Sequence, residues 1–208
     1  MIQTYSFSEA GGHPANEDAF VVQVIPNTPD GWLVCVADGQ GGRAGGAKAA
    51  QVACDSAVSV VGRGGYHPDI LSRADEAVAA HHEAGFTTLI SFSVEGNRVS
   101  GASSGDSAVL AIGGSGDIAE LTAQQFKNPP VGSGEAVFVP FQSELVRPWK
   151  VLAMTDGVWK YVGWQRMREL ATKLSGEELL TALQTAARLP HSGQFQDDFT
   201  VVLLGATE

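Results

Sequence analysis

Cysteine and basic residues are scarce in this sequence of 208 residues. It contains 2 Cys, and its 13 Lys and Arg are outnumbered by 23 Asp and Glu, which gives a formal net charge of −10. Nucleic acids and anionic membranes require a basic surface, so neither is expected as the main partner. The acidity has two explanations, solubility or a carboxylate cluster that holds metal, and a count of charges does not separate them.

Other signals are missing as well. Cys35 and Cys54 each lie in an apolar run, so we expect buried free thiols rather than a disulfide. The sequence has no zinc-type spacing of His and Cys. No apolar run reaches the ~20 residues of a membrane span. The first 12 residues lack the features of a secretion signal, so a cytoplasmic protein is expected. The length suits one domain over residues 1–208.

The order of predicted elements indicates the fold class. Helices are predicted from apolar periodicity and strands from β-branched runs between turn residues. The predicted helices span 47–61, 68–83, 164–174 and 177–189. The predicted strands span 2–7, 19–25, 32–37, 87–94, 98–103, 107–112, a short segment ending at 121, 136–139, 150–154 and 199–204. Residues 124–135 are predicted to form a loop. Helices in pairs between runs of strands predict an α+β protein with packed sheets and helices outside.

Acidic motifs recur where predicted strands begin or end. Glu17 and Asp18 precede a strand, Asp38 and Asp156 each follow one, and Asp197 lies just before the last strand. A carboxylate buried within a strand would be costly, whereas at a strand end it can reach a cleft. Oxygen ligands without His or Cys are typical of Mg²⁺ or Mn²⁺ sites.

Six motifs, in order along nearly the whole chain, resemble those of the protein phosphatase 2C family, the PPM metal-dependent serine/threonine phosphatases. HPANED at 13–18 is similar to RxxNED, and VADGQGG at 36–42 to VxDGxGG. GFTT at 85–88 is similar to a GTT-type strand start. GDS at 105–107 matches a family motif. TDGVW at 155–159 is similar to SDGLW, and DDFTVV at 197–202 to DNxTxxV.

The resemblance implies a four-layer α/β/β/α sandwich of two antiparallel sheets flanked by helix pairs. It also implies two core Mn²⁺ or Mg²⁺ ions. Asp38 would contact both ions, Asp156 and Asp197 the first, and Glu17 and the carbonyl of Gly39 the second. A third, weaker ion would bind Asp106 together with Asp156.

The implied activity is hydrolysis of phosphoserine and phosphothreonine in proteins by a metal-bridging hydroxide. The expected partners are a phosphorylated protein and a serine/threonine kinase that the enzyme opposes. The alternative is a phosphatase-fold binding or regulatory module with weak or no catalysis. Inactive relatives typically lose the metal acids, and this chain retains them, which favours the enzyme.

Two substitutions affect the expected phosphate site. His13 replaces the family's Arg, which clamps phosphate with a planar and permanently charged fork. Gln40 stands where many members have His, and Gln cannot donate a proton as an acid. Either His13 contacts the substrate phosphate or it is a loop residue without a ligand. Arg43 is the second candidate phosphate contact, with a solvated residue at the start of a helix as its alternative.

Overall fold

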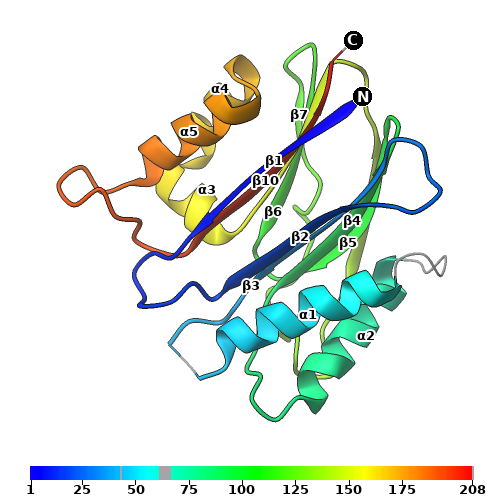
Figure 1. Cartoon of the computed structure of the whole chain (residues 1–208), viewed down its shortest axis with the longest axis vertical. Coiled ribbons are helices and arrows are strands. Elements are labelled where there is room, and N and C mark those ends of the chain that lie inside the picture. Colours follow the sequence, from blue (N-terminus) through cyan, green and yellow to red (C-terminus); the bar gives the residue numbers. More distant parts are fainter. Residues whose placement is uncertain (43, 61–66, 208) are drawn as a thin grey trace.

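The computed structural model describes residues 1–42, 44–60 and 67–207 of the chain. Within these residues, ten strands form two antiparallel five-stranded sheets (Figure 1). Sheet A contains, in spatial order, β1 (Ile2–Glu9), β10 (Phe199–Ala206), β9 (Trp149–Met154), β6 (Ala108–Gly113) and β7 (Ile118–Glu120). Sheet B contains, in spatial order, β2 (Asp18–Val24), β3 (Gly31–Asp38), β4 (Leu89–Glu95), β5 (Arg98–Ser104) and β8 (Val139–Glu144).

Helices cover the outer face of each sheet (Figure 1). Sheet B is covered by α1 (Gly46–Val60) and α2 (His67–Ala80). Sheet A is covered by α3 (Asp156–Val162), α4 (Trp164–Lys173) and α5 (Gly176–Ala187). The predicted four-layer α/β/β/α sandwich is confirmed. The second helix layer holds three helices, however, because α3 precedes the predicted pair.

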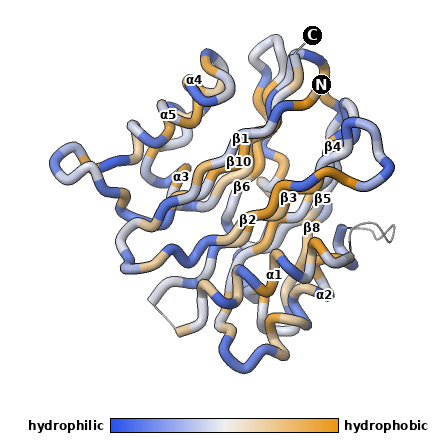
Figure 2. The backbone as a smooth tube through the Cα atoms, viewed as in Figure 1, coloured by the Kyte–Doolittle hydropathy of each residue, from blue (hydrophilic) through white to orange (hydrophobic). Residues whose placement is uncertain are grey.

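Strand periodicity explains how one chain fills three apolar cores. Successive side chains of a strand point to opposite faces of the sheet. In β9, Val151 and Ala153 therefore lie between the two sheets, whereas Leu152 and Met154 face the helices. Central strands such as β3 (GWLVCVAD) and β10 (FTVVLLGA) are accordingly rich in hydrophobic residues (Figure 2). Burial on both faces fixes the register, because a slip by one residue would exchange the two sets of side chains.

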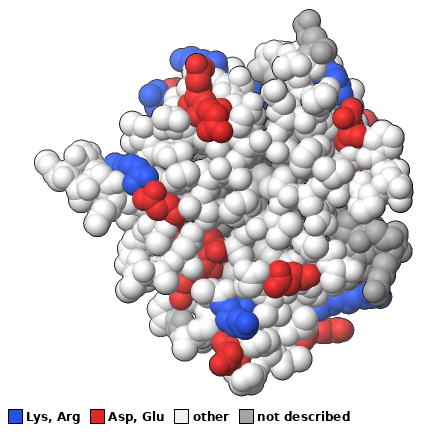
Figure 3. Space-filling view, in the orientation of Figure 1, with Lys and Arg blue, Asp and Glu red and all other residues white. Residues whose placement is uncertain are grey.

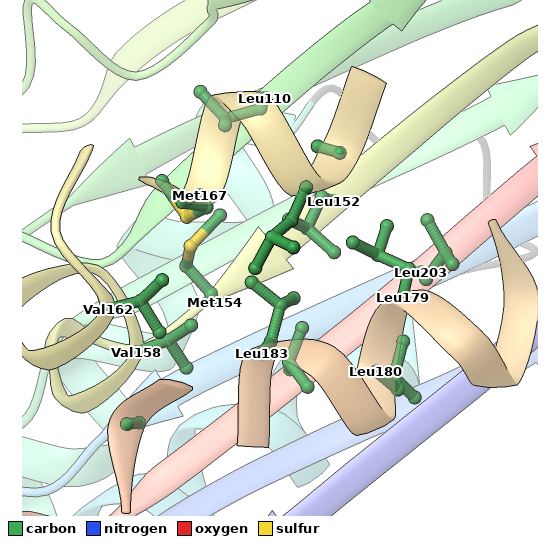
Figure 4. Packing of buried hydrophobic residues seen from close by; sticks show 14 of the residues in the cluster. Leu110, Leu152, Met154, Val158, Val162, Met167, Leu179, Leu180, Leu183 and Leu203 are labelled. Atoms are coloured by element: carbon green, nitrogen blue, oxygen red, sulfur yellow. The ribbon is translucent and has the colours of Figure 1, made fainter. Parts of the chain in front are cut away.

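The core between sheet A and its helices is built from long aliphatic side chains (Figure 4). Leu152 and Leu203 on the sheet face Leu179 and Leu183 of α5, and Met154 packs close to α3. Burying each such side chain contributes about 1.5–3 kcal/mol relative to its exposed form. This packing holds α3 against the sheet and fixes the position of its first residue, Asp156.

Two predicted elements differ from the structure by three residues or more. The predicted strand 136–139 is wrong, because the strand here is β8, which runs from Val139 through Pro140 to Glu144. Proline lacks an N–H group and is tolerated at the edge of a sheet, where β8 lies. The helix predicted to continue to Glu83 ends at Ala80. The last residue of the predicted helix 47–61 lies outside the described residues.

The missed helix α3 is short and contains residues that favour other structures. Its 7 residues begin with Asp-Gly, a turn signal, and include Val, Trp and Tyr, which are weak helix formers. Burial of Val158 and Val162 against the sheet stabilises it instead. Packing against the sheet, which no local sequence pattern shows, therefore determines that this segment is helical.

Charged side chains are dispersed over the face shown in Figure 3, where acidic groups lie singly or in small clusters on otherwise uncharged surface. Cys35 and Cys54 are free and buried, as predicted. Burial raises the pKa of Cys35 to about 12. Among the helices of the described ranges, none has the length and apolarity needed to cross a membrane.

His67 is a half-buried titratable group at the start of α2. Its Nδ1 lies 3.3 Å from Ser91 Oγ, and its Nε2 lies 3.2 Å from Ser93 Oγ. Burial lowers the pKa of His67 to about 4. The unfolded chain, with a His pKa near 6.5, therefore binds the extra proton between about pH 6.5 and pH 4. The stability that neutral His67 contributes is lost as the pH falls through this window.

We expect this loss to reach roughly 3 kcal/mol of the free energy of unfolding at pH 4. The test is urea unfolding at pH 7.5 and pH 4.5 of the wild type and of His67→Gln, which cannot titrate. The variant should lose less stability on acidification than the wild type. The exposed His191 offers a control, because His191→Gln should leave the wild-type pH dependence in place. Equal losses in the wild type and His67→Gln would contradict the prediction.

Candidate metal centre

The backbone around Asp38 is fixed by two neighbouring segments. The N–H of Asp38 donates to Thr88 Oγ1 at 3.0 Å, and its carbonyl oxygen accepts from the N–H of Thr88 at 2.9 Å. The N–H of Gly39 donates to the carbonyl of Glu17 at 3.2 Å. A Cβ on Gly39 would lie 2.5 Å from that same carbonyl oxygen, so only glycine fits. Asp38 is therefore presented from a rigid strand end.

Glu17 lies on the connection between β1 and β2, which joins the two sheets (Figure 1). Asp198 holds this connection, because its carboxylate accepts from the N–H of Gly11 at 2.8 Å and from the N–H of Glu17 at 2.6 Å. Asp198 is 6% exposed. It is thus a positioning residue for Glu17. Sequence reasoning assigned a role only to its neighbour Asp197.

Replacing Asp198 with Ala should lower the free energy of unfolding by about 3 kcal/mol. The substitution would leave two backbone N–H groups without their acceptor, at about 1–3 kcal/mol for each buried donor. It should also weaken Mn²⁺ binding, because Glu17 would lose its backbone anchor. Chemical denaturation and Mn²⁺ titration provide the measurements.

The matched control for Asp198 is Asp117→Ala. Asp117 is an exposed acid whose carboxylate accepts from Ser115 on the β6–β7 turn, and its loss should change stability by less than ~0.5 kcal/mol. If Asp198→Ala were as stable as Asp117→Ala, Asp198 would have no anchoring role.

Sheet A supplies Asp156 and Asp197. Asp156 is the first residue of α3, directly after β9, and it forms an i, i+4 ion pair with Lys160. Asp197 precedes β10, and its Oδ1 accepts from the N–H of Asp198 at 3.0 Å. The N–H of Thr155 donates to the carbonyl of Thr200 at 3.0 Å, which joins the ends of β9 and β10. Two adjacent strands therefore present the two acids side by side.

These acids line one cavity of about 450 Å³. The predicted site residues along its wall are His13, Glu17, Asp38, Gly39, Asp106, Asp156 and Asp197. Gln40 also lines it, and so does Lys127, which sequence reasoning did not single out. Arg43, the second predicted phosphate contact, lies outside the described residues.

Electrostatic repulsion concentrates on Asp38. Burial raises its pKa well above the usual range, and the charges of Asp18, Asp156, Asp106 and Asp197 raise it further. Burial also raises the pKa of Asp156, although its hydrogen bond from Lys160 opposes that effect. An ionised Asp38 is therefore unfavourable in the metal-free protein, and a cation in the cavity would relieve the repulsion.

The carboxylates line the cavity without converging on one point. Across residues 1–42, 44–60 and 67–207, no three Asp, Glu, His or Cys side chains are close enough to share one ion. Asp156 pairs with Lys160 instead, and Asp106 with Lys127.

The buried oxygens of the site nevertheless fit a cation. Glu17 Oε2, in the wall of the cavity, is buried and has no hydrogen-bond partner within the described part of the chain. Oδ1 of the next residue, Asp18, is also buried without a partner there, although Asp18 does not line the cavity. Buried polar atoms normally have such partners, so these orphaned oxygens suit a position that a cation would complete. An all-oxygen set of acids matches Mn²⁺ or Mg²⁺.

Size alone would select a different cavity. A hollow of about 640 Å³ lies between sheet A and the α4–α5 turn, where its wall includes Lys150 and Glu177. Lys150 Nζ already donates to the carbonyl of Leu174 at 2.8 Å. The acidic cavity is the stronger candidate because its carboxylates repel one another and leave buried oxygens unpartnered.

Comparisons with known proteins agree with this fold. The serine/threonine phosphatase PstP/Ppp of Mycobacterium tuberculosis has a TM-score of 0.82 at 19% identity, over 100% of this chain and 99% of that chain. The PstP catalytic domain in complex with 2 manganese ions has a TM-score of 0.81 at 18% identity, over 100% and 99%. RsbX in complex with magnesium has a TM-score of 0.79 at 16% identity, over 98% and 94%.

Sequence comparison adds the family. No curated protein sequence gives a significant match. The model of the family described as Stage II sporulation protein E (SpoIIE) matches residues 28–207, which is most of the chain. The structural likeness confirms the predicted fold, and the chain belongs to the Stage II sporulation protein E (SpoIIE) family.

Proposed function

We propose that this chain is a metal-dependent protein serine/threonine phosphatase of the PPM type. The observation that carries the proposal is the acidic cavity itself. Carboxylates from both sheets line the cavity together with Asp38, and burial and the neighbouring acids make the charge of Asp38 unfavourable. Stability alone would not favour such an arrangement, which suggests that it serves to bind cations.

The residues would divide between two Mn²⁺ or Mg²⁺ ions. Asp38 would contact both, Asp156 and Asp197 the first, and Glu17 with the carbonyl of Gly39 the second. When bound, the ions would activate a shared water as hydroxide and offset charge on the phosphoryl oxygens. Lys160 would release Asp156 for this purpose, and its side chain is already 40% exposed.

The open side of the cavity is proposed to receive the phosphate. His13 points into this space, because its Cε1 lies 3.1 Å and its Nε2 3.4 Å from the position of a Cβ on Gly41. Glu17 Oε2 also lies 3.4 Å from that position. A neutral imidazole offers one donor to a phosphoryl oxygen, less than the fork of an Arg. Gln40 can orient water or substrate through its amide, but it cannot supply a proton.

The proposed substrate is a protein that carries phosphoserine or phosphothreonine. A structural neighbour supports this class, since PstP is named a serine/threonine protein phosphatase. A signalling role opposite a serine/threonine kinase, and a cytoplasmic location, remain part of the proposal. Both follow from the sequence resemblance and composition.

The test is release of inorganic phosphate from phosphothreonine and phosphoserine peptides. Release should require Mn²⁺ or Mg²⁺ and stop with EDTA, and Asp156→Asn should lower turnover at least ~100-fold. Asp117→Asn, far from the cavity on the β6–β7 turn, should retain full turnover. Undiminished release in EDTA would reject the proposal. A protein that binds these peptides in Mn²⁺ without releasing phosphate would instead support the binding module.

A further inference from the structure

Asp106 was predicted to hold a third metal ion, but the structure places an ammonium group there. Lys127 Nζ forms an ion pair with Asp106 Oδ2 in the wall of the acidic cavity. We infer that Lys127 is a built-in cation that takes the place of a third divalent ion, so that the site holds two ions and one lysine. This inference rests on the proposed two-metal function of the same cavity.

Two hydrogen bonds to the backbone on either side of Asp106 place Lys127 beside it. The carbonyl of Phe126 accepts from the N–H of Gly105 at 2.8 Å, and Gln125 Nε2 donates to the carbonyl of Ser107 at 2.6 Å. Residues on both sides of Asp106 are therefore bound to the two residues that precede Lys127. The ion pair is thus fixed by the hydrogen bonds that hold the segment around Asp106 against the segment before Lys127. The length of the lysine side chain is not its only cause.

The far end of the same loop is anchored as well. Thr87 and Val131 exchange two backbone hydrogen bonds of 3.0 and 3.1 Å. Thr87 also donates its hydroxyl to the carbonyl of Asp38 at 2.8 Å. On the other side of Asp106, Trp159 Nε1 donates to its carbonyl at 3.0 Å. Asp106 and Lys127 are therefore held in a frame that includes the backbone of Asp38.

Competition for the same oxygens explains why a third ion would be excluded. The third ion would need Asp106 together with Asp156, and Asp156 is also required by the core ions. Asp106 is then the main remaining ligand, and the tethered ammonium of Lys127 already contacts it. The exposed ion pair between Lys127 and Asp106 is weak in water, and so is a divalent ion held by one free carboxylate. The ion must be captured from solution, however, whereas the ammonium of Lys127 is tethered next to Asp106 at a high effective concentration. Lys127 therefore prevails over the ion at Asp106.

Counting bound Mn²⁺ by isothermal titration calorimetry tests the inference without any measurement of catalysis. The wild type should bind two ions, whereas Lys127→Met should bind a third at least tenfold more tightly than any third ion of the wild type. Lys127→Arg keeps the charge and should bind two. The double variant Lys127→Met with Asp106→Asn should return to two. Lys127 is 64% exposed, so these variants are expected to fold, and thermal unfolding verifies it.

Three ions in the wild type, or two in Lys127→Met, would overturn the inference and leave the proposed function intact. A wild type that binds no Mn²⁺ would reject the proposed function, and the inference with it. Two ions in the wild type and three in Lys127→Met would support both.

Discussion

Replacing Asp38 with Asn should abolish phosphatase turnover and, in the absence of metal, stabilise the fold. The carboxylate is the shared ligand of the proposed metal pair, so its loss should lower turnover by at least ~100-fold. Asn has nearly the same shape but carries no charge. It therefore removes the repulsion that burial and the neighbouring acids Asp18 and Asp156 impose on Asp38.

The sign of the pH effect follows from the raised pKa of Asp38. The folded state retains the proton at pH values where the unfolded chain has released it. The stability contributed by protonated Asp38 is therefore complete below pH ~4 and is lost as the pH rises through the folded-state pKa. Metal-free wild type should lose this contribution towards neutral pH, whereas Asp38→Asn should not.

Thermal unfolding at pH 7.5 in EDTA and in Mn²⁺ measures both effects. The wild type should gain stability with Mn²⁺, by about 2.7 kcal/mol per site at 100 times Kd. Asp38→Asn should start higher in EDTA and gain less with Mn²⁺, and the exposed control Asp117→Asn should follow the wild type. A variant that is less stable than the wild type in EDTA would show that the charge of Asp38 is not a cost to the metal-free fold.

Replacing Gly157 with Ala should cost about 3 kcal/mol or more of stability and lower Mn²⁺ affinity at least tenfold. A Cβ on Gly157 would lie 2.0 Å from the carbonyl oxygen of Asp198 and 3.3 Å from Asp197 Cβ. The first contact is with backbone, so α3 would have to move away from the start of β10. That movement would separate Asp156, on α3, from Asp197.

A second glycine gives the matched control. The nearest atom to a Cβ on Gly113, at the end of β6, lies 3.8 Å away, so Gly113→Ala should stay within ~0.5 kcal/mol of the wild type. Urea unfolding and Mn²⁺ titration of both variants distinguish the cases. If Gly157→Ala matched Gly113→Ala in both measurements, the close approach of α3 to Asp198 would not control the site.

The sequence was informative where local chemistry restricts what a residue can do. Carboxylates such as Asp38 and Asp156 occur at strand ends because burial within a strand would be costly, and strand ends are visible in the hydrophobic pattern. The fold class followed from the same pattern together with the family motifs. The structure brings the predicted acids into one cavity, while their roles as metal ligands stay predictions.

The sequence did not predict features that depend on contacts between distant parts of the chain. Lys127 reaches Asp106 only because Phe126 and Gln125 bond to a segment about 20 residues earlier in the chain, and no local spacing encodes that. Asp198 was quoted within a motif, yet its two N–H donors come from the opposite end of the chain. Edge strand β8 was misplaced because it is defined by its pairing with β5, about 40 residues earlier in the chain, and no local pattern shows that pairing.

The acids of the cavity belong to different layers. Asp38 ends a strand of sheet B, whereas Asp156 and Asp197 follow and precede strands of sheet A. The distance across the site is therefore set by the separation of the two sheets, which side chains such as Phe92 and Val151 fix from within. The acids from the two sheets thus face each other across the gap between the layers, and a cation would bridge that gap. Any substitution that shifts one sheet relative to the other, however far from the cavity, would change the spacing of the acids. It would therefore change the affinity for a cation without altering any ligand residue.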